Sequence, residues 1–149
     1  VYERNLIAKK GIFRPQTAYS DKVALLKLYP GINPDILDMF YEKGYKGIFI
    51  EGFGLGGMPF INNDFIGRVG EMVEKGMLVL VGSQCRYEGS NLMVYETGRL
   101  AIEKGVIQAY DMTAEAAITK LMWVLGQTDD IREMKEYFSV NIAGEVNIG

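Results

Sequence analysis

One stretch of the sequence constrains the fold more than any other: a continuous apolar run that leads directly into a cluster of glycines. The run is Gly47–Ile50, and after Glu51 it passes into the glycine-rich segment Gly52–Gly57. Short, continuous, β-branched or aromatic runs are typical of strands that are buried on both faces of a parallel sheet. Glycines that follow such a strand indicate a sharp bend or a close approach by another group. The sequence therefore predicts a central parallel strand that ends in a tight glycine loop.

The glycines have the spacing of a dinucleotide-binding fingerprint, Gly52-x-Gly54-x-x-Gly57, but their surroundings differ from it. The fingerprint needs its third glycine in the first turn of a helix, whose N-terminus faces a pyrophosphate. Here Met58–Phe60 intervenes, and the next helix is expected only near Asn63–Asp64. A P-loop is excluded as well, because no Lys-Ser or Lys-Thr pair follows the glycines. We therefore expect the loop to serve a tight turn or a small polar ligand.

Apolar runs and helix signals alternate along the rest of the chain. Buried strands are predicted at Val23–Leu28 and Met77–Val81, and Val106–Ile107 is long enough for a short fourth strand. Helices are expected over about residues 34–43, 64–75, 94–104, 113–125 and 128–138, with N-caps at Asn33, Asn63 and Thr113.

This alternation with short loops predicts an α/β fold, a three-layer open parallel sheet of about four strands flanked by helices, flavodoxin- or Rossmann-like. Residues 1–22 are interpreted as an irregular lead-in or linker, and residues 23–149 as one domain.

Composition narrows the classes of function. The 149 residues are 48% hydrophobic and 23% charged, which is typical of a globular chain. The net charge of −3 comes from interspersed acids and bases with no basic stripe, so we expect no direct contact with nucleic acid. No apolar run reaches the length of a bilayer span and no leader is recognised, so we expect no membrane association. A single cysteine, Cys85, excludes an internal disulfide and is compatible with a reducing cytoplasm.

The chain contains no histidine. A Ser–His or Cys–His nucleophile pair is therefore impossible within it, and the commonest zinc sites lack a ligand. Acid–base chemistry would have to come from Asp, Glu, Lys or Tyr. We expect no metal site, and we interpret Cys85 as a packed or polar-lined thiol rather than a nucleophile.

Ligands of open parallel sheets bind at the carboxyl ends of the strands. That edge holds three predicted loops, at Tyr29–Asn33, Gly52–Asn63 and Ser83–Asn91. The third loop is the most polar, and two interpretations stay open: a wall of hydrogen-bonding groups around a small polar ligand, or a solvated loop. Glu51 ends a buried strand, so its carboxylate is expected to face this crevice or to pair with an Arg or Lys.

Five segments together resemble a known family. They are Leu28-Tyr29-Pro30-Gly31, Gly54-x-Gly56-x-x-Pro59, Ser83-Gln84-Cys85, Tyr95-Glu96-Thr97-Gly98 and Asp111-Met112-Thr113-x-Glu115-Ala116-x-x-Thr119-Lys120-Leu121. In this order and at these spacings they resemble the C-terminal domain of type I, cytoplasmic-type L-asparaginases. The related D subunit of archaeal glutamyl-tRNA(Gln) amidotransferase is similar. The resemblance covers about Val23–Ser139.

The resemblance implies a cytoplasmic enzyme that hydrolyses L-asparagine to L-aspartate and ammonia without a cofactor. In that family a threonine nucleophile and its partners lie in a larger N-terminal domain, which begins with a Thr-Gly-Gly-Thr segment. No such segment occurs here. We therefore expect no catalytic residue in this chain, an N-terminal catalytic domain of the same polypeptide as its partner, and no hydrolysis by the chain alone.

The resemblance also implies a homo-oligomer, a dimer or a dimer of dimers, in which each C-terminal domain helps to close a neighbour's active site. By position, Tyr95 and Glu96 are the candidates for that contact with substrate, although both also suit an ordinary first helical turn. Some type I enzymes bind asparagine as an effector in loops that Ser83 and Cys85 match. Glu51 stands where those enzymes often carry an arginine, so the partner for an effector carboxylate is missing. We expect asparagine not to activate this protein through that site.

Three alternatives remain beside the asparaginase interpretation. In the first alternative, the chain is part of the D subunit of an amidotransferase, which also uses an asparaginase-like core but delivers ammonia for tRNA-bound glutamate. Alternatively it is a small amino-acid-binding module without catalysis, or a domain that only supplies subunit contacts.

Overall fold

Four strands form one parallel sheet in the order β1-β2-β3-β4 in the computed structural model, which describes residues 14–60, 64–85, 87 and 89–148. The described elements are β1 (Val23–Lys27), α1 (Asp35–Glu42), β2 (Gly47–Gly52), α2 (Phe65–Glu74), β3 (Leu78–Ser83), α3 (Glu96–Glu103), β4 (Ile107–Gln108), α4 (Ala114–Gln127) and α5 (Ile131–Phe138). The predicted α/β fold with about four parallel strands is confirmed.

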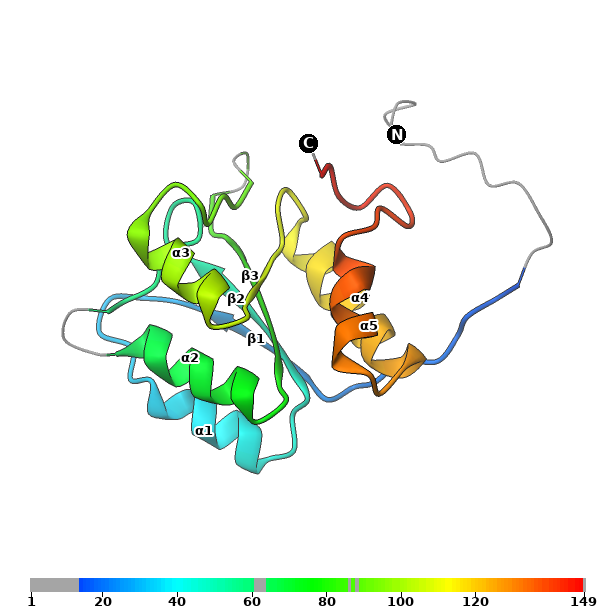
Figure 1. The fold of residues 1–149 in the computed structure, drawn as a ribbon, viewed down its shortest axis with the longest axis horizontal. Helices are drawn as coiled ribbons and strands as arrows, with labels where there is room; N and C mark the ends of the chain where they lie inside the picture. The colour runs from blue at the N-terminus through cyan, green and yellow to red at the C-terminus, as the bar shows by residue number, and fades with distance from the viewer. Residues whose placement is uncertain (1–13, 61–63, 86, 88, 149) are drawn as a thin grey trace.

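The sheet lies between two helical layers, with α1, α2 and α3 on one face and α4 and α5 on the other (Figure 1). The central strand β2 contributes to both cores, because successive side chains point to opposite faces. Ile48 and Ile50 belong to the cluster under α1–α3, whereas Phe49 packs in the cluster under α4 and α5. All three are at most 1% exposed, as the continuous apolar run predicts.

Strand β1 differs from its prediction as a buried strand. Among the described strands it is an edge strand with β2 as its one neighbour, and Leu25 on it is 49% exposed. Ala24 and Leu26 on the opposite face are buried. The run Val23–Leu28 is apolar on both faces, so its sequence alone does not reveal that the α4 layer leaves part of β1 uncovered.

Of the predicted N-caps, Thr113 is confirmed and Asn33 is not: Pro34 is the N-cap of α1 and makes no side-chain cap bond, and the side chain of Asn33 instead accepts from the amide of Asp35. The hydroxyl of Thr113 accepts a hydrogen bond from the amide of Ala116, as predicted. Helix α2 is capped by Asp64, whose carboxylate accepts from the amide of Gly67, one residue later than predicted; Asn63 lies outside the described residues. The last helix begins after Asp130 rather than at Thr128, because Asp130 supplies its cap.

The segment that precedes β1, described from Arg14, contacts α4 although it has no regular structure. Its backbone carbonyls at Gln16 and Ala18 accept hydrogen bonds from the side chains of Trp123 and Gln127, at 3.0 and 2.7 Å. A Cβ atom at Gly126 would lie 2.4 Å from this backbone, so a glycine is needed there. The described part of the expected linker, residues 14–22, therefore contacts the domain.

The C-terminal segment, residues 140–148, is fixed to α4 by a buried ion pair. The ammonium group of Lys120, whose side chain is 5% exposed, donates to a carboxylate oxygen of Glu145 and to the carbonyl of Val140, each at 2.6 Å. Burial disfavours the charged form of Glu145, but hydrogen bonds from Lys120, Ala143 and Ile142 outweigh it and lower the pKa of this carboxyl to about 2. Within the described part of the chain, no helix combines the length and apolar character needed to cross a membrane.

The Glu145 pKa predicts a specific dependence of stability on pH. Because the pKa is lower in the folded state than the ordinary value of 4.5, the pair stabilises the fold above pH 4.5, and this contribution disappears as the pH falls from 4.5 towards 2. The loss amounts to at most about 3 kcal/mol. Glu145→Gln should be destabilised by a comparable amount at neutral pH, since Lys120 is then buried without a counter-ion.

Urea unfolding of both proteins at several pH values measures this effect. The difference in unfolding free energy between wild type and Glu145→Gln should shrink between pH 4.5 and 2, when Glu145 becomes neutral. Other carboxyl groups titrate equally in both proteins and cancel in the difference. A constant difference across this range contradicts the prediction.

Candidate functional site

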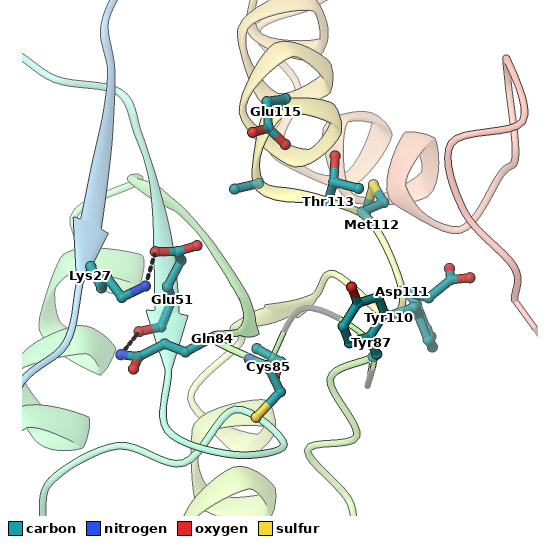
Figure 2. A pocket seen from close by; sticks show the side chains of 13 residues that line it. Lys27, Glu51, Gln84, Cys85, Tyr87, Tyr110, Asp111, Met112, Thr113 and Glu115 are labelled. Carbon is teal, nitrogen blue, oxygen red and sulfur yellow. Dashed lines mark hydrogen bonds and ion pairs between the residues drawn. The ribbon is translucent and has the colours of Figure 1, made fainter.

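A hollow of about 660 Å³ lies where the carboxyl ends of β1, β2 and β3 face the start of α4. Figure 2 shows the strand-end side chains on one side and the residues that lead into α4 on the other. Its position agrees with the general rule for ligands of open parallel sheets. The described lining residues are Lys27, Glu51, Ser83, Gln84, Cys85, Tyr87, Gly89, Tyr110, Asp111, Met112, Thr113, Ala114 and Glu115.

Glu51 faces this hollow and also pairs with a cation, as predicted. Its side chain is 17% exposed, and the ammonium nitrogen of Lys27 lies 3.6 Å from its carboxylate oxygen. The Lys27 side chain is 62% exposed, so the pair is solvated and weakly stabilising. Lys27 comes from β1 and Glu51 from the next strand, at paired positions in the register.

Ser83 lines the hollow, but its hydroxyl group already binds two backbone groups. It donates a hydrogen bond to the carbonyl of Gly54 and accepts one from the amide of Cys85, at 2.8 Å. Ser83 therefore joins the glycine loop to the end of β3. Cys85 next to it is an exposed free thiol on the wall of the hollow.

Gln84 connects the ends of three strands. Its side-chain amide donates to the carbonyl of Glu51 at 3.0 Å (Figure 2). The same amide donates to the carbonyl of Leu28 at 2.6 Å, and the backbone amide of Gln84 donates to the carbonyl of Gly52. Carbonyl groups beyond the ladder need such partners when they are partly buried. The polarity of this loop thus comes partly from groups that hold the strand ends together.

The opposite wall of the hollow, Tyr110–Glu115, was not among the three predicted loops. It follows β4, so it lies at the same edge of the sheet as the loops after the other strands. The short fourth strand was the available signal, because the loop after it belongs to the carboxyl edge as well. The glycine loop, by contrast, turns away: Phe53 and Gly57 form an isolated bridge, and neither lines the hollow. Because Gly57 lies in this bridge and not in the first turn of a helix, the geometry supports the rejection of the dinucleotide fingerprint.

The charges around the hollow are mainly negative. Of the described lining residues, Glu51, Asp111 and Glu115 carry carboxylates, and Lys27 carries the one ammonium group. A surface of this sign attracts cationic or neutral groups better than a carboxylate. The described residues contain no group of three or more Cys, Asp or Glu side chains placed to hold a metal ion.

Tyr95 and Glu96 lie apart from the hollow. Tyr95 is the extended residue before α3, with φ −111° and ψ 152°, and Glu96 is the first residue of that helix, which begins slightly later than the expected start at Val94. Both are on the surface, and Met93, Val94 and Tyr95 form a continuous exposed apolar segment. Gly98 allows α3 to pack closely against the start of this segment, because a Cβ atom there would lie 2.1 Å from the carbonyl oxygen of Leu92.

Residues 22–138 match the model of a family described as the glutaminase/asparaginase C-terminal domain. The chain belongs to this family. The match spans every described strand and helix, and it confirms the resemblance that the sequence motifs carry.

Relatives of this asparaginase-family domain include two archaeal proteins that are named as the D subunit of glutamyl-tRNA(Gln) amidotransferase. The protein from Thermofilum pendens is 46% identical over 132 residues, which are 89% of this chain and 29% of the relative. The protein from Pyrococcus abyssi is 49% identical over 126 residues, which are 85% of this chain and 28% of the relative. The chain therefore spans less than a third of the length of these relatives.

Solved structures of L-asparaginases share its fold. The thermostable L-asparaginase from Thermococcus kodakarensis superposes with a TM-score of 0.83 at 39% identity, covering 89% of this chain and 40% of that one. L-asparaginase I from Vibrio cholerae has a TM-score of 0.83 at 27% identity, covering 93% of this chain and 41% of that one.

Proposed function

We propose that this chain is the C-terminal domain of an L-asparaginase-like amidohydrolase, whose complete protein converts L-asparagine and water to L-aspartate and ammonia. The family match over residues 22–138 carries the proposal, and the likeness to the Thermococcus kodakarensis enzyme supports it. The domain contributes oligomer contacts and helps to close a neighbouring subunit's active site. A cytoplasmic location and the absence of a cofactor follow from the same type I resemblance.

The chemistry of the hollow supports placing the catalytic groups outside this chain. The hydroxyl groups of Ser83 and Thr113, which line the hollow, bind backbone groups of the domain. The chain has no histidine to activate Cys85. These properties of Ser83, Thr113 and Cys85 are consistent with a nucleophile that an N-terminal catalytic domain of the same polypeptide supplies.

The second candidate is the D subunit of a glutamyl-tRNA(Gln) amidotransferase. The identities of 46% and 49% to proteins of that name support it. The domain fills 28–29% of those relatives and 40–41% of the asparaginase chains, so the amidotransferase relatives are longer. The gene sequence upstream of Val1 discriminates between the two, because the amidotransferase protein carries an additional N-terminal domain. A binding or assembly module without catalysis is the remaining alternative.

Ammonia release from L-asparagine tests the proposal directly. The 149-residue chain alone should release none, whereas the full-length protein should turn over without added cofactor. Ammonia release from L-glutamine should be measured in parallel. The second candidate function is tested by tRNA-dependent transfer of ammonia in the presence of an amidotransferase partner subunit. Turnover by the chain alone contradicts the proposal, as does a full-length protein that binds asparagine without releasing ammonia.

Tyr95 and Glu96 are the proposed contacts with the neighbour's active site. In the full-length enzyme, Tyr95→Ala and Glu96→Gln should each lower kcat/KM by roughly tenfold or more, the effect of losing one interaction near the reacting groups. Glu103→Gln is the matched control, since it removes the same charge from the other end of α3. Equal kinetics for Glu96→Gln and Glu103→Gln would mean that Glu96 only completes a helical turn.

The acidic hollow predicts simple saturation kinetics with asparagine. Glu51 and its neighbouring carboxylates disfavour a bound effector carboxylate, so the rate of the full-length enzyme should depend hyperbolically on asparagine concentration. Initial rates over a wide concentration range measure this. A sigmoidal dependence that Cys85→Ser or Ser83→Ala abolishes would overturn the prediction and assign the hollow to asparagine.

A further inference from the structure

The wall of the hollow contains a residue in an unfavourable backbone conformation. Tyr110 has a φ of +53°, and among the described residues it is the one non-glycine residue with a positive φ. It occupies the turn in which the amide of Met112 donates to the carbonyl of Ala109 at 3.1 Å. Such conformations are unfavourable for non-glycine residues and persist only where surrounding contacts impose them.

The first set of imposing contacts comes from the loop between β3 and α3. Ser90 is 4% exposed, and its amide and hydroxyl both donate to the carbonyl of Tyr110, at 2.6 and 3.1 Å. The side chain of Gln108 in turn bonds the carbonyl of Ser90 and the amide of Leu92, at 3.0 and 3.1 Å. A Cβ atom at Gly89 would lie 3.0 Å from the Tyr110 carbonyl oxygen, so the two backbones are in close contact.

The second set comes from the C-terminal segment. The backbone amide of Asn147 donates to one carboxylate oxygen of Asp111 at 2.7 Å, and its side-chain amide donates to the other oxygen. The preceding residues are well fixed, because Val146 is 1% exposed and Glu145 is paired with Lys120. Asn147 is therefore presented to Asp111 by an anchored segment.

Tyr110 and Asp111 stand between two hollows. Both line the 660 Å³ hollow, and both line a shallower one of about 470 Å³ that also includes Ser90 and Asn147. A change at the turn therefore alters the hollow on one side. The same change displaces the carbonyl of Tyr110, to which Ser90 donates its hydrogen bonds, and Ser90 lies in the loop that leads to Tyr95. Coupling between distant positions requires an element with two discrete states. Non-glycine residues favour negative φ, so a second backbone conformation is available in principle to a tyrosine at this turn.

We propose that Tyr110–Asp111 is a strained wall segment, held by Ser90 and by Asn147, that couples the hollow to the loop carrying Tyr95 and Glu96. The functional meaning of that loop rests on the proposed function, whereas the coupling itself does not. Release of the C-terminal segment from Asp111 relaxes Tyr110, reshapes the hollow and loosens residues 90–98.

The test is Asn147→Asp in the full-length protein, which sets a second carboxylate against that of Asp111. Asn33→Asp is the matched control: Asn33 donates to Asp35 at 3.1 Å, so the same substitution again opposes two carboxylates, at a place that lines neither hollow. Asn147→Ala is a milder variant, because it removes the side-chain hydrogen bond to Asp111 without adding a second carboxylate. Peptide-resolved hydrogen exchange and the alkylation rate of Cys85, quantified on its own peptide, are the readouts.

Asn147→Asp should raise amide exchange at residues 109–112 and at residues 90–98 by roughly tenfold or more, and should change the alkylation rate of Cys85 severalfold. Asn147→Ala should give the same pattern with smaller amplitude, and it decides the result if Asn147→Asp unfolds the domain. Faster exchange confined to residues 140–148 overturns the proposal, and faster exchange at 109–112 without 90–98 overturns the coupling. An equal effect of Asn33→Asp overturns it as well. None of these readouts uses ammonia release, so they fail or succeed independently of the proposed activity.

Discussion

The burial of β2 on both faces is the constraint on which the rest of the domain depends. A strand covered on both faces needs hydrogen-bonding neighbours at both edges and an apolar layer on each side. The parallel neighbours β1 and β3 provide the first, and the two helical layers provide the second. Parallel pairing then sets the carboxyl ends of the strands at one edge, where the backbone leaves the ladder. The hollow is a consequence of that geometry.

Polar residues at this edge serve the backbone before they serve a ligand. Gln84 hydrogen-bonds the carbonyl of Leu28, directly after β1, and that of Glu51, near the end of β2. The hydroxyl of Ser83 binds the glycine loop and the amide of Cys85. Both residues look like ligand-binding groups when only composition is considered. Their bonds in the structure explain why a polar loop after a buried strand is weak evidence for a binding site: the strand ends themselves require hydrogen-bond partners.

Local patterns predicted the elements, and long-range contacts account for most of what they missed. The apolar run of β2, the cap at Thr113 and the helix order depend on residues close in sequence, so they were readable. The exposed face of β1 depends on how far α4 extends over the sheet, which no local pattern reports. The bond from Asn147 to Asp111 joins residues 36 positions apart, and the pair of Lys120 and Glu145 joins residues 25 positions apart. The polar C-terminal segment therefore gave no sign that it is anchored.

For the wall opposite the strand ends, the sequence allows the position to be predicted but not the shape. Its place follows from the rule for parallel sheets once β4 is accepted as a strand, although β4 has only two residues. Its shape follows from the conformation of Tyr110, which a sequence does not specify, because tyrosine favours negative φ and adopts the left-handed region only where other contacts force it. Those contacts come from two segments, the loop that contains Ser90 and the C-terminal segment that contains Asn147. The position of this wall is thus set by contacts between segments that lie far apart in the sequence.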